Sequence, residues 1–277
     1  MNEAIQKLFD LKGEVAIVTG GLGQLGSEYV KTLASAGASV AIFDIADQPK
    51  PKVQKMLDEG LPISVYKVDI TDKKEVKRLY AEVAAKFGAP TILINNAGID
   101  ASPNVPVSGT GAYEDFPEEI WDAVIDSHLK GMFLMSQEFL RAIKGSNKKG
   151  SIINISSTYG LVSPDQSIYD SQRQNGATFF KPVAYSVAKS GVLNFTRWLA
   201  EYCRQAGIAV RVNTFVPGGV FNNQPEEFLE EYNKRTILGR MAREDEYNAA
   251  ILFLASNNAS SYMTGSMLVV DGGWTAR

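Results

Sequence analysis

The chain has 277 residues, of which 45% are hydrophobic and 21% are charged, a composition typical of a globular enzyme that excludes a disordered protein. Its length is near the upper limit for one hydrophobic core, so we expect a single domain over residues 1–277 with insertions. A net charge of −3 and the lack of a basic stripe argue against a nucleic-acid partner, and we interpret Lys148 and Lys149 as a solvated turn.

The chain carries no pattern that predicts export or a membrane anchor. Its first residues mix charged with apolar side chains, and no later apolar run approaches the length that spans a membrane. Cys203 is the only cysteine, which excludes an internal disulfide, and it falls in a helical pattern where a small half-buried residue fits. We therefore expect a cytoplasmic protein without a membrane partner.

Short apolar runs alternate with helical patterns along the whole chain. Strands are expected at 15–19, 39–43, 63–68, 91–95, 151–156, 210–216 and 267–270. Helices are expected at 24–36, 50–59, 72–87, 117–143, 183–206 and 243–256, with Asp72 and Pro117 as helix starts. This alternation predicts an α/β fold, a single doubly wound Rossmann-type domain whose seven-stranded parallel sheet is flanked by helices.

Three stretches interrupt the alternation, at 99–116, 158–182 and 221–240. Each follows the carboxyl end of an expected strand. Open α/β sheets bind their ligands at that edge, so these stretches are the candidate substrate loops.

A glycine-rich turn follows the first expected strand. Gly21, Gly23 and Gly26 form a Gly-x-Gly-x-x-Gly pattern, and a helix follows at once. Glycines let the backbone approach a pyrophosphate, whose charge then meets the N–H groups of the helix N-terminus. The alternative is a purely structural turn, but the position of the turn in the first βαβ unit favours a dinucleotide site.

The second expected strand runs into Asp44, close to the usual offset for a carboxylate that binds the adenosine ribose. A carboxylate at this position repels the 2′-phosphate of NADP, and no Arg or Lys occupies 45–48. The sequence therefore favours NAD over NADP.

The helix expected at 183–206 places Tyr185 and Lys189 on one face, four residues apart. A cation beside a phenol favours the phenolate, so we expect Lys189 to lower the pKa of Tyr185. The strand expected at 151–156 brings the hydroxyls of Ser156 and Ser157 to the same edge of the sheet, where a hydroxyl can orient a carbonyl or an alcohol.

With these features in place, residues 11–275 resemble a short-chain dehydrogenase/reductase of the common single-domain type. The matching motifs are, in order, Thr19-Gly20-Gly21-Leu22-Gly23-Gln24-Leu25-Gly26, Asp44, Val68-Asp69-Ile70, Asn95-Asn96-Ala97-Gly98, Ser157-Thr158-Tyr159-Gly160, Tyr185 with Lys189, Pro217-Gly218 and Asp271-Gly272-Gly273-Trp274.

The resemblance implies roles for individual residues. Tyr185 would be the acid/base, Lys189 would lower its pKa and bind the nicotinamide ribose, and Ser157 would position the substrate oxygen. The expected cofactor-binding residues are Gly20, Gly23, Gln24, Leu25, Gly26, Asp44, Asp69, Ile70, Asn96, Ala97, Tyr185, Lys189 and Val220. The family also implies a homodimer or homotetramer.

The chain departs from the family at two positions near the expected site. Gln24 stands where the family usually has its second glycine, and His128 stands where the family commonly has an Asn beside the catalytic Lys. His128 is interpreted either as a packed histidine on the face shared with Trp121 and Ile125 or as a substituted, catalytic member of a proton relay. As the only histidine, with no cysteine cluster, it predicts no metal site.

The segment between Ser157 and Tyr185 is longer than is usual in the family. The excess is interpreted as a lid or specificity loop, with an oligomer contact as the alternative. Gln166 and Tyr169 in this segment and Asn222 after the sixth strand are the candidate substrate-binding residues. Their polar groups suggest a sugar, a sugar acid or a polyol, and the chain is similar to family members in bacterial surface-sugar pathways.

These observations predict an NAD-dependent enzyme that interconverts a secondary alcohol and a ketone on a polar, sugar-like or sugar-acid small molecule. One alternative is a 3-ketoacyl-ACP-type reductase, which would prefer NADPH and bind an acyl carrier, and Asp44 argues against it. Another is a non-catalytic NAD-binding redox sensor, which would not need Ser157, Tyr185 and Lys189 together.

Overall fold

The computed structural model describes residues 2–100, 111–176 and 179–276. Its centre is a seven-stranded sheet in the order β3-β2-β1-β4-β5-β6-β7, with every pair of neighbours parallel. The strands are β1 Val15–Thr19, β2 Ser39–Asp44, β3 Ile63–Lys67, β4 Ile92–Asn95, β5 Gly150–Ile155, β6 Val210–Pro217 and β7 Met267–Val270. This confirms the predicted sheet.

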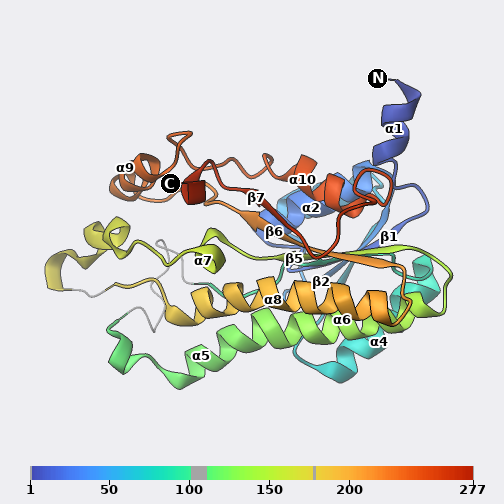
Figure 1. The fold of residues 1–277 in the computed structure, drawn as a ribbon, viewed down its shortest axis with the longest axis horizontal. Helices are drawn as coiled ribbons and strands as arrows, with labels where there is room; N and C mark the ends of the chain where they lie inside the picture. Colours follow the sequence, from blue (N-terminus) through green and yellow to red (C-terminus); the bar gives the residue numbers. More distant parts are fainter. Residues whose placement is uncertain (1, 101–110, 177–178, 277) are drawn as a thin grey trace.

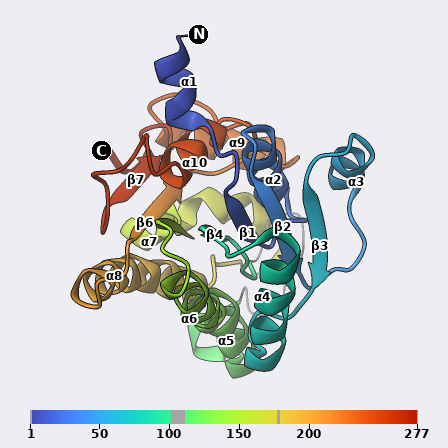
Figure 2. The same ribbon diagram turned by 90° about the vertical axis from the view of Figure 1, so that its right-hand side faces the viewer.

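Helices cover both faces of the sheet, as Figures 1 and 2 show. The α-helices are α1 Glu3–Phe9, α2 Gln24–Ser35, α3 Pro51–Asp58, α4 Lys73–Phe87, α5 Glu118–Ile125, α6 Gly131–Lys144, α7 Thr158–Leu161, α8 Val183–Gln205, α9 Glu226–Arg235 and α10 Asn248–Ala255. One face carries α2, α3 and α10, and the opposite face carries α4, α5, α6 and α8 (Figure 2). The fold is a doubly wound α/β structure.

The alternation of side chains along the strands builds one apolar core on each face. In β1, Ala16 and Val18 pack with residues of α2 and α10, whereas Val15 and Ile17 pack with residues of α4, α6 and α8. All four are buried. Because helices cover both faces, the central strands are apolar at nearly every position.

The chain order of the strands reverses at β1, which lies between β2 and β4. The connections after β1 and β4 therefore leave the sheet in opposite directions. A crevice opens at the carboxyl ends of these strands, which is where doubly wound sheets bind dinucleotides.

The helix expected at 117–143 is interrupted by a π-helical segment, Asp126–Lys130, between α5 and α6. The wider turn is closed by the N–H of Gly131 donating to the carbonyl of Asp126. One extra residue in a single turn hardly changes the hydrophobic periodicity of a sequence. The sequence therefore predicted one continuous α-helix here. Such segments are frequently found at functional sites.

The prediction that 221–240 is irregular was wrong, because α9 lies within it. Pro225 stands at the N-cap, acidic residues fill the first turn and basic residues the last. The segment 158–182 also contains α7 and a 3₁₀ helix, Gln166–Gly176. Most of the loop expected at 99–116 lies outside the described residues.

The N-terminal helix α1 was not predicted, and it buries none of its residues. It projects from the top of the molecule in Figure 1. None of the helices in the described part of the chain combines the length and the apolar character needed to cross a membrane.

Candidate active site

A cavity of about 320 Å³ lies at the carboxyl ends of β5 and β6 and beneath α9. Its lining includes eight of the predicted residues, which are Leu25, Asn96, His128, Ser157, Tyr169, Tyr185, Lys189 and Val220. Most of the predicted proton chemistry and part of the predicted dinucleotide site therefore meet in one place.

The glycine turn has the shape of a cradle for a dinucleotide. Gly20 has a φ of 63°, and a Cβ there would lie 2.9 Å from the Cα of Ala97. A Cβ on Gly26 would collide with the carbonyl of Gly20. Gly23 is the N-cap of α2 and offers no side chain to its N–H groups, so the helix N-terminus is suited to a pyrophosphate.

Asp44 ends β2 beside this turn. Its carboxylate accepts hydrogen bonds from the N–H of Leu22 at 3.0 Å and from the N–H of Ala46 at 3.1 Å. These bonds fix the carboxylate at the rim of the glycine turn, where the predicted ribose contact would be made.

Asn96 joins the end of β4 to the same turn. Its amide donates to the carbonyls of Thr19 at 3.0 Å and Gly20 at 3.2 Å, and the Thr19 hydroxyl accepts from the N–H groups of Asn96 and Ala97. The two predicted cofactor residues that follow β3 are Asp69 and Ile70. The Asp69 carboxylate accepts a hydrogen bond from the N–H of Thr71, and the Ile70 side chain is buried against Gly131.

Gln24, which replaces a family glycine, reaches across the crevice. Its amide donates to the carbonyl of Phe221 at 2.8 Å. The substitution therefore joins the first turn of α2 to the loop that follows β6.

Ser157 and Lys189 lie on two sides of the cavity. Ser157 caps α7, with its hydroxyl accepting from the N–H of Tyr159 at 3.2 Å. The ammonium of Lys189 donates to the carbonyl of Ile155 at 2.9 Å and lies 5.6 Å from the centre of the Tyr185 ring. Burial lowers the pKa of Lys189 to about 8, with Asp100 opposing this effect and Lys181 adding to it.

The expectation that the pKa of Tyr185 is lowered was wrong. Burial raises the pKa of the phenol, the Asp100 carboxylate raises it further, and a hydrogen bond with Ser157 opposes these effects. The cost of placing a phenolate away from water and near a carboxylate exceeds the stabilisation that the Ser157 hydrogen bond gives it. In this environment Tyr185 is a phenol at neutral pH.

His128 lies in the π-helical segment and contacts Tyr185 directly. The two rings are 5.5 Å apart and nearly perpendicular, at 84°. The Nε2 of His128 lies 2.9 Å from the carbonyl of Ile99, and a Cβ on Gly98 would fall on the imidazole ring. Burial, then the charge of Lys189, lowers the pKa of His128 to about 3, so the ring is neutral.

Two of the three predicted substrate-binding residues do not line this cavity. The side-chain amide of Gln166 instead forms hydrogen bonds with the backbone of Lys181. Asn222 is exposed, and its backbone N–H donates to the side chain of Gln224. Gln224 lines the cavity in place of Asn222. Tyr169 does line it, with its hydroxyl 3.3 Å from that of Tyr159.

Sequence reasoning missed two charged residues of the cavity, Asp100 and Lys181. Asp100 lies two residues after the Asn95-Asn96-Ala97-Gly98 motif, and Lys181 lies four residues before Tyr185. Their Oδ1 and Nζ atoms are 2.6 Å apart. A charged residue immediately before the helix that carries Tyr185 was the available signal.

The roof of the cavity is an aromatic cluster that joins two of the three predicted substrate segments, 158–182 and 221–240. Tyr169 packs against Phe179 at 5.0 Å and against Phe228 of α9 at 5.6 Å between ring centres. Tyr232 of α9 stacks on Trp274 at 4.6 Å. The two segments therefore pack on one another instead of forming independent loops.

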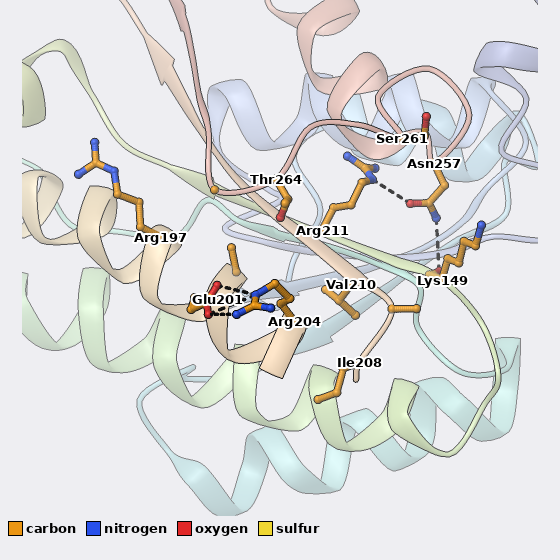
Figure 3. A pocket seen from close by; sticks show the side chains of 13 residues that line it. Lys149, Arg197, Glu201, Arg204, Ile208, Val210, Arg211, Asn257, Ser261 and Thr264 are labelled. Atoms are coloured by element: carbon orange, nitrogen blue, oxygen red, sulfur yellow. Dashed lines mark hydrogen bonds and ion pairs between the residues drawn. The ribbon is translucent and has the colours of Figure 1, made fainter. Parts of the chain in front are cut away.

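A larger cavity of about 520 Å³ lies at the amino end of β6, away from these residues (Figure 3). Two of its basic side chains, Arg211 and Arg204, already have partners. Arg211 donates to the carbonyls of Leu254 and Ser256 and to Asn257, and Arg204 pairs with Glu201. The described lining of this cavity holds no nucleophile or acid/base arrangement like that around Tyr185.

Comparison with known proteins gives consistent matches over nearly the whole chain. A family model described as "Enoyl-(Acyl carrier protein) reductase" matches residues 23–275. A cis-4-hydroxycyclohexanecarboxylate dehydrogenase from Sinomonas cyclohexanicum is 34% identical, over 95% of this chain and 96% of its own. A galactitol 2-dehydrogenase from Rhizobium johnstonii is 32% identical, over 98% of each chain.

Among solved structures, a short chain dehydrogenase from Leptospira borgpetersenii with bound NAD⁺ matches with a TM-score of 0.81. It is 32% identical, over 99% of this chain and 97% of its own. The fold, the ordered motifs and these relatives agree, and the chain belongs to the short-chain dehydrogenase/reductase family of oxidoreductases.

Proposed function

We propose that the protein is an NAD-dependent dehydrogenase that interconverts a secondary alcohol and a ketone on a polar, sugar-like or sugar-acid substrate. The observation that carries the proposal is the meeting of Tyr185, Ser157 and Lys189 in one cavity beside the glycine turn. The relatives from Sinomonas cyclohexanicum and Rhizobium johnstonii, named for a hydroxylated carboxylate and a polyol, support the substrate class.

The residues around the crevice suit a nicotinamide dinucleotide. Gly20, Gly23, Gly26 and the N-terminus of α2 would hold the pyrophosphate, and Asp44 would bind the adenosine ribose. When bound, the nicotinamide would supply the hydride acceptor for oxidation and the hydride donor for reduction.

The protein's own side chains would handle the proton. In reduction, Tyr185 donates its phenolic proton to the oxygen of the ketone as the carbon gains a hydride, and Ser157 orients that oxygen. In oxidation, the alcohol returns the proton to the Tyr185 oxygen and loses a hydride from carbon. Lys189 stabilises the charge on the Tyr185 oxygen in both directions.

Replacing Tyr185 by Phe tests this assignment. A positioned proton donor contributes roughly 10²–10⁴-fold to rate, so Tyr185→Phe should lower kcat by at least that range. NADH binding, followed by its fluorescence, should stay within about twofold of wild type because the hydroxyl is not needed for folding.

The matched control is Tyr262→Phe, the same change at a fully exposed position. It should leave kcat unchanged. Substantial turnover by the Tyr185→Phe enzyme would refute the role of the phenol.

The preference for NAD rests on Asp44. Wild type should show a kcat/KM for NAD⁺ at least tenfold above that for NADP⁺, because the carboxylate repels a 2′-phosphate. Asp44→Ala should narrow the ratio, chiefly through a lower KM for NADP⁺. Equal use of both cofactors by wild type would contradict the proposal.

The description of the matching family model supports a second candidate, a reductase of acyl-carrier thioesters. A panel read by NADH absorbance separates the two. Polyols, sugar acids and hydroxy acids are offered with NAD⁺, and acetoacetyl thioesters with NADH or NADPH. Thioester reduction with NADPH as the best activity would favour the second candidate.

We also propose that the enzyme is a homodimer or homotetramer. Phe133 on α6 and Trp198 and Tyr202 on α8 are exposed by 45%, 63% and 43%. Large aromatic side chains gathered on exposed helix faces are typical of interfaces.

A further inference from the structure

The ammonium of Lys181 lies inside the cavity that holds Tyr185. Its side chain is 7% exposed, and its Nζ lies 4.6 Å from the centre of the Tyr185 ring. The Asp100 carboxylate, 2.6 Å away, is the more exposed partner, at 40%. Burying an ammonium costs free energy. A buried lysine beside the phenol of Tyr185 is therefore a candidate for a function in the cavity.

The described part of the segment between α7 and α8 positions the backbone of Lys181. The Gln166 amide accepts from the N–H of Lys181 at 2.9 Å and donates to its carbonyl at 3.4 Å. Arg173 in turn donates to the carbonyl of Gln166 at 2.7 Å and to that of Phe179 at 2.8 Å. Side chains of this segment therefore fix the backbone on which Lys181 is carried.

The same segment is tied to α9 on its outer side. Arg235 pairs with Asp165 at 2.6 Å and donates to the Ser167 hydroxyl at 2.6 Å. Contacts within the insertion therefore hold the backbone of Lys181, and contacts with α9 hold the insertion itself.

The charges that line the cavity do not cancel. Lys181 and Lys189 are its two ammoniums, and Asp100 is the only carboxylate among its described lining residues. His128, the remaining basic group, is neutral because burial lowers its pKa to about 3. A site lined by more ammoniums than carboxylates favours an anionic substrate.

We propose that Lys181 binds the carboxylate of a hydroxy-acid substrate, and that the insertion exists to hold it there. This inference rests on the proposed function and narrows its substrate class from polar alcohols to acids. Ser157 and Tyr185 hold the reacting oxygen while Lys181 holds the anionic end, so Lys181 sets both affinity and orientation.

The test compares acids with neutral alcohols of matched skeleton. The probes are D-gluconate against D-glucitol and 3-hydroxybutyrate against 2-butanol, each with NAD⁺, on wild type, Lys181→Met and Lys181→Arg. For the better acid, wild type should show a kcat/KM at least tenfold above its neutral partner. Lys181→Met should bring the ratio of kcat/KM for the acid to kcat/KM for the neutral alcohol close to one, mainly by raising KM for the acid.

Two further variants separate charge from structure. Lys181→Arg should restore a large part of the preference, and Gln166→Ala should weaken it by misplacing Lys181. Lys144→Met, a change of the same kind at an exposed position of α6, should leave the ratio unchanged. Thermal melts of all variants identify any that fail to fold.

A binding measurement keeps this inference separable from the proposed function. The Tyr185→Phe enzyme loaded with NADH is titrated with acetoacetate and with 2-butanone by calorimetry, with and without Lys181→Met. Tighter binding of the acid that depends on Lys181 supports the inference even if no member of the panel turns over. Binding of acid and ketone alike, or an acid preference that survives Lys181→Met, overturns it.

Discussion

Burial governs the ionisation of the polar residues around Tyr185. It raises the pKa of the phenol, lowers the pKa of Lys189 to about 8 and lowers the pKa of His128 to about 3. Each shift favours the neutral form, as expected where water is excluded. Tyr185 therefore holds its proton at neutral pH, which is the form from which the proposed reduction of a ketone would start.

Asp100 should influence the pH dependence of oxidation. Burial is the main cause of the raised pKa of Tyr185, and the Asp100 carboxylate raises it further, so the phenolate needed for oxidation forms only at alkaline pH. Asp100→Asn removes that charge and should shift the rise in kcat/KM for oxidation to lower pH. The profile with NAD⁺ and the best alcohol of the panel measures this.

The same substitution also removes the charge that holds the pKa of Lys189 up. A neutral Lys189 would raise the pKa of the Tyr185 phenol, whereas loss of the Asp100 charge lowers it. The direction in which the pH profile moves therefore reports which of the two effects on Tyr185 is larger. A shift of the oxidation limb to higher pH would contradict the assignment of Asp100 as the group that opposes the phenolate.

At the scale of elements, local backbone features place the polar side chains around Tyr185. The π-helical segment Asp126–Lys130 brings His128 against Tyr185, and α7 begins at Ser157 because its hydroxyl caps that turn. The face of His128 is covered by Gly98, where no side chain would fit. Its structure matches a packed, hydrogen-bonded residue, and its part in a proton relay stays a prediction.

Gln24 should act on the substrate loop rather than on the dinucleotide. Gln24→Ala removes the hydrogen bond to Phe221 and should raise KM for the substrate severalfold, with Kd for NADH within about twofold of wild type. The loss of stability should be at most about 1 kcal/mol, because the bond is exposed. Steady-state kinetics and NADH fluorescence provide the two measurements.

Gln205→Ala is the matched control, since this exposed amide bonds to Glu201 on the surface of α8. It should change neither constant. A weaker NADH affinity with an unchanged KM in Gln24→Ala would instead assign the amide to the cofactor site.

At the scale of the whole molecule, the exposed aromatic face of α8 should mediate assembly. Trp198 and Tyr202 stack at 5.6 Å with 6° between their rings, a flat surface that a second copy can cover. Light scattering should give wild type a mass two or four times the chain mass of 30.2 kDa, and Trp198→Glu should shift it towards the monomer.

The control for assembly is Ile5→Glu on α1, a helix that buries none of its residues. It should leave the mass unchanged. An unaltered assembly in Trp198→Glu, or a monomeric wild type, would refute a role for this face.

The sequence by itself determined the sheet and the arrangement of motifs. Hydrophobic periodicity is a local property, so β1 and β7 were placed at the residues where the structure has them. The glycine turn, Asp44 and the pair of Tyr185 and Lys189 were equally readable, because each depends on a short spacing within one element.

Only the tertiary structure decided the electrostatics of the cavity and which residues of the insertion line it. The sign of the Tyr185 pKa shift depends on burial and on Asp100, which lies far from Tyr185 in the chain. Likewise, the backbone contacts of Gln166 and the burial of Lys181 arise when the insertion folds against α8 and α9. Solvent exclusion and contacts between distant segments are properties of the packed molecule, so no local pattern could report them.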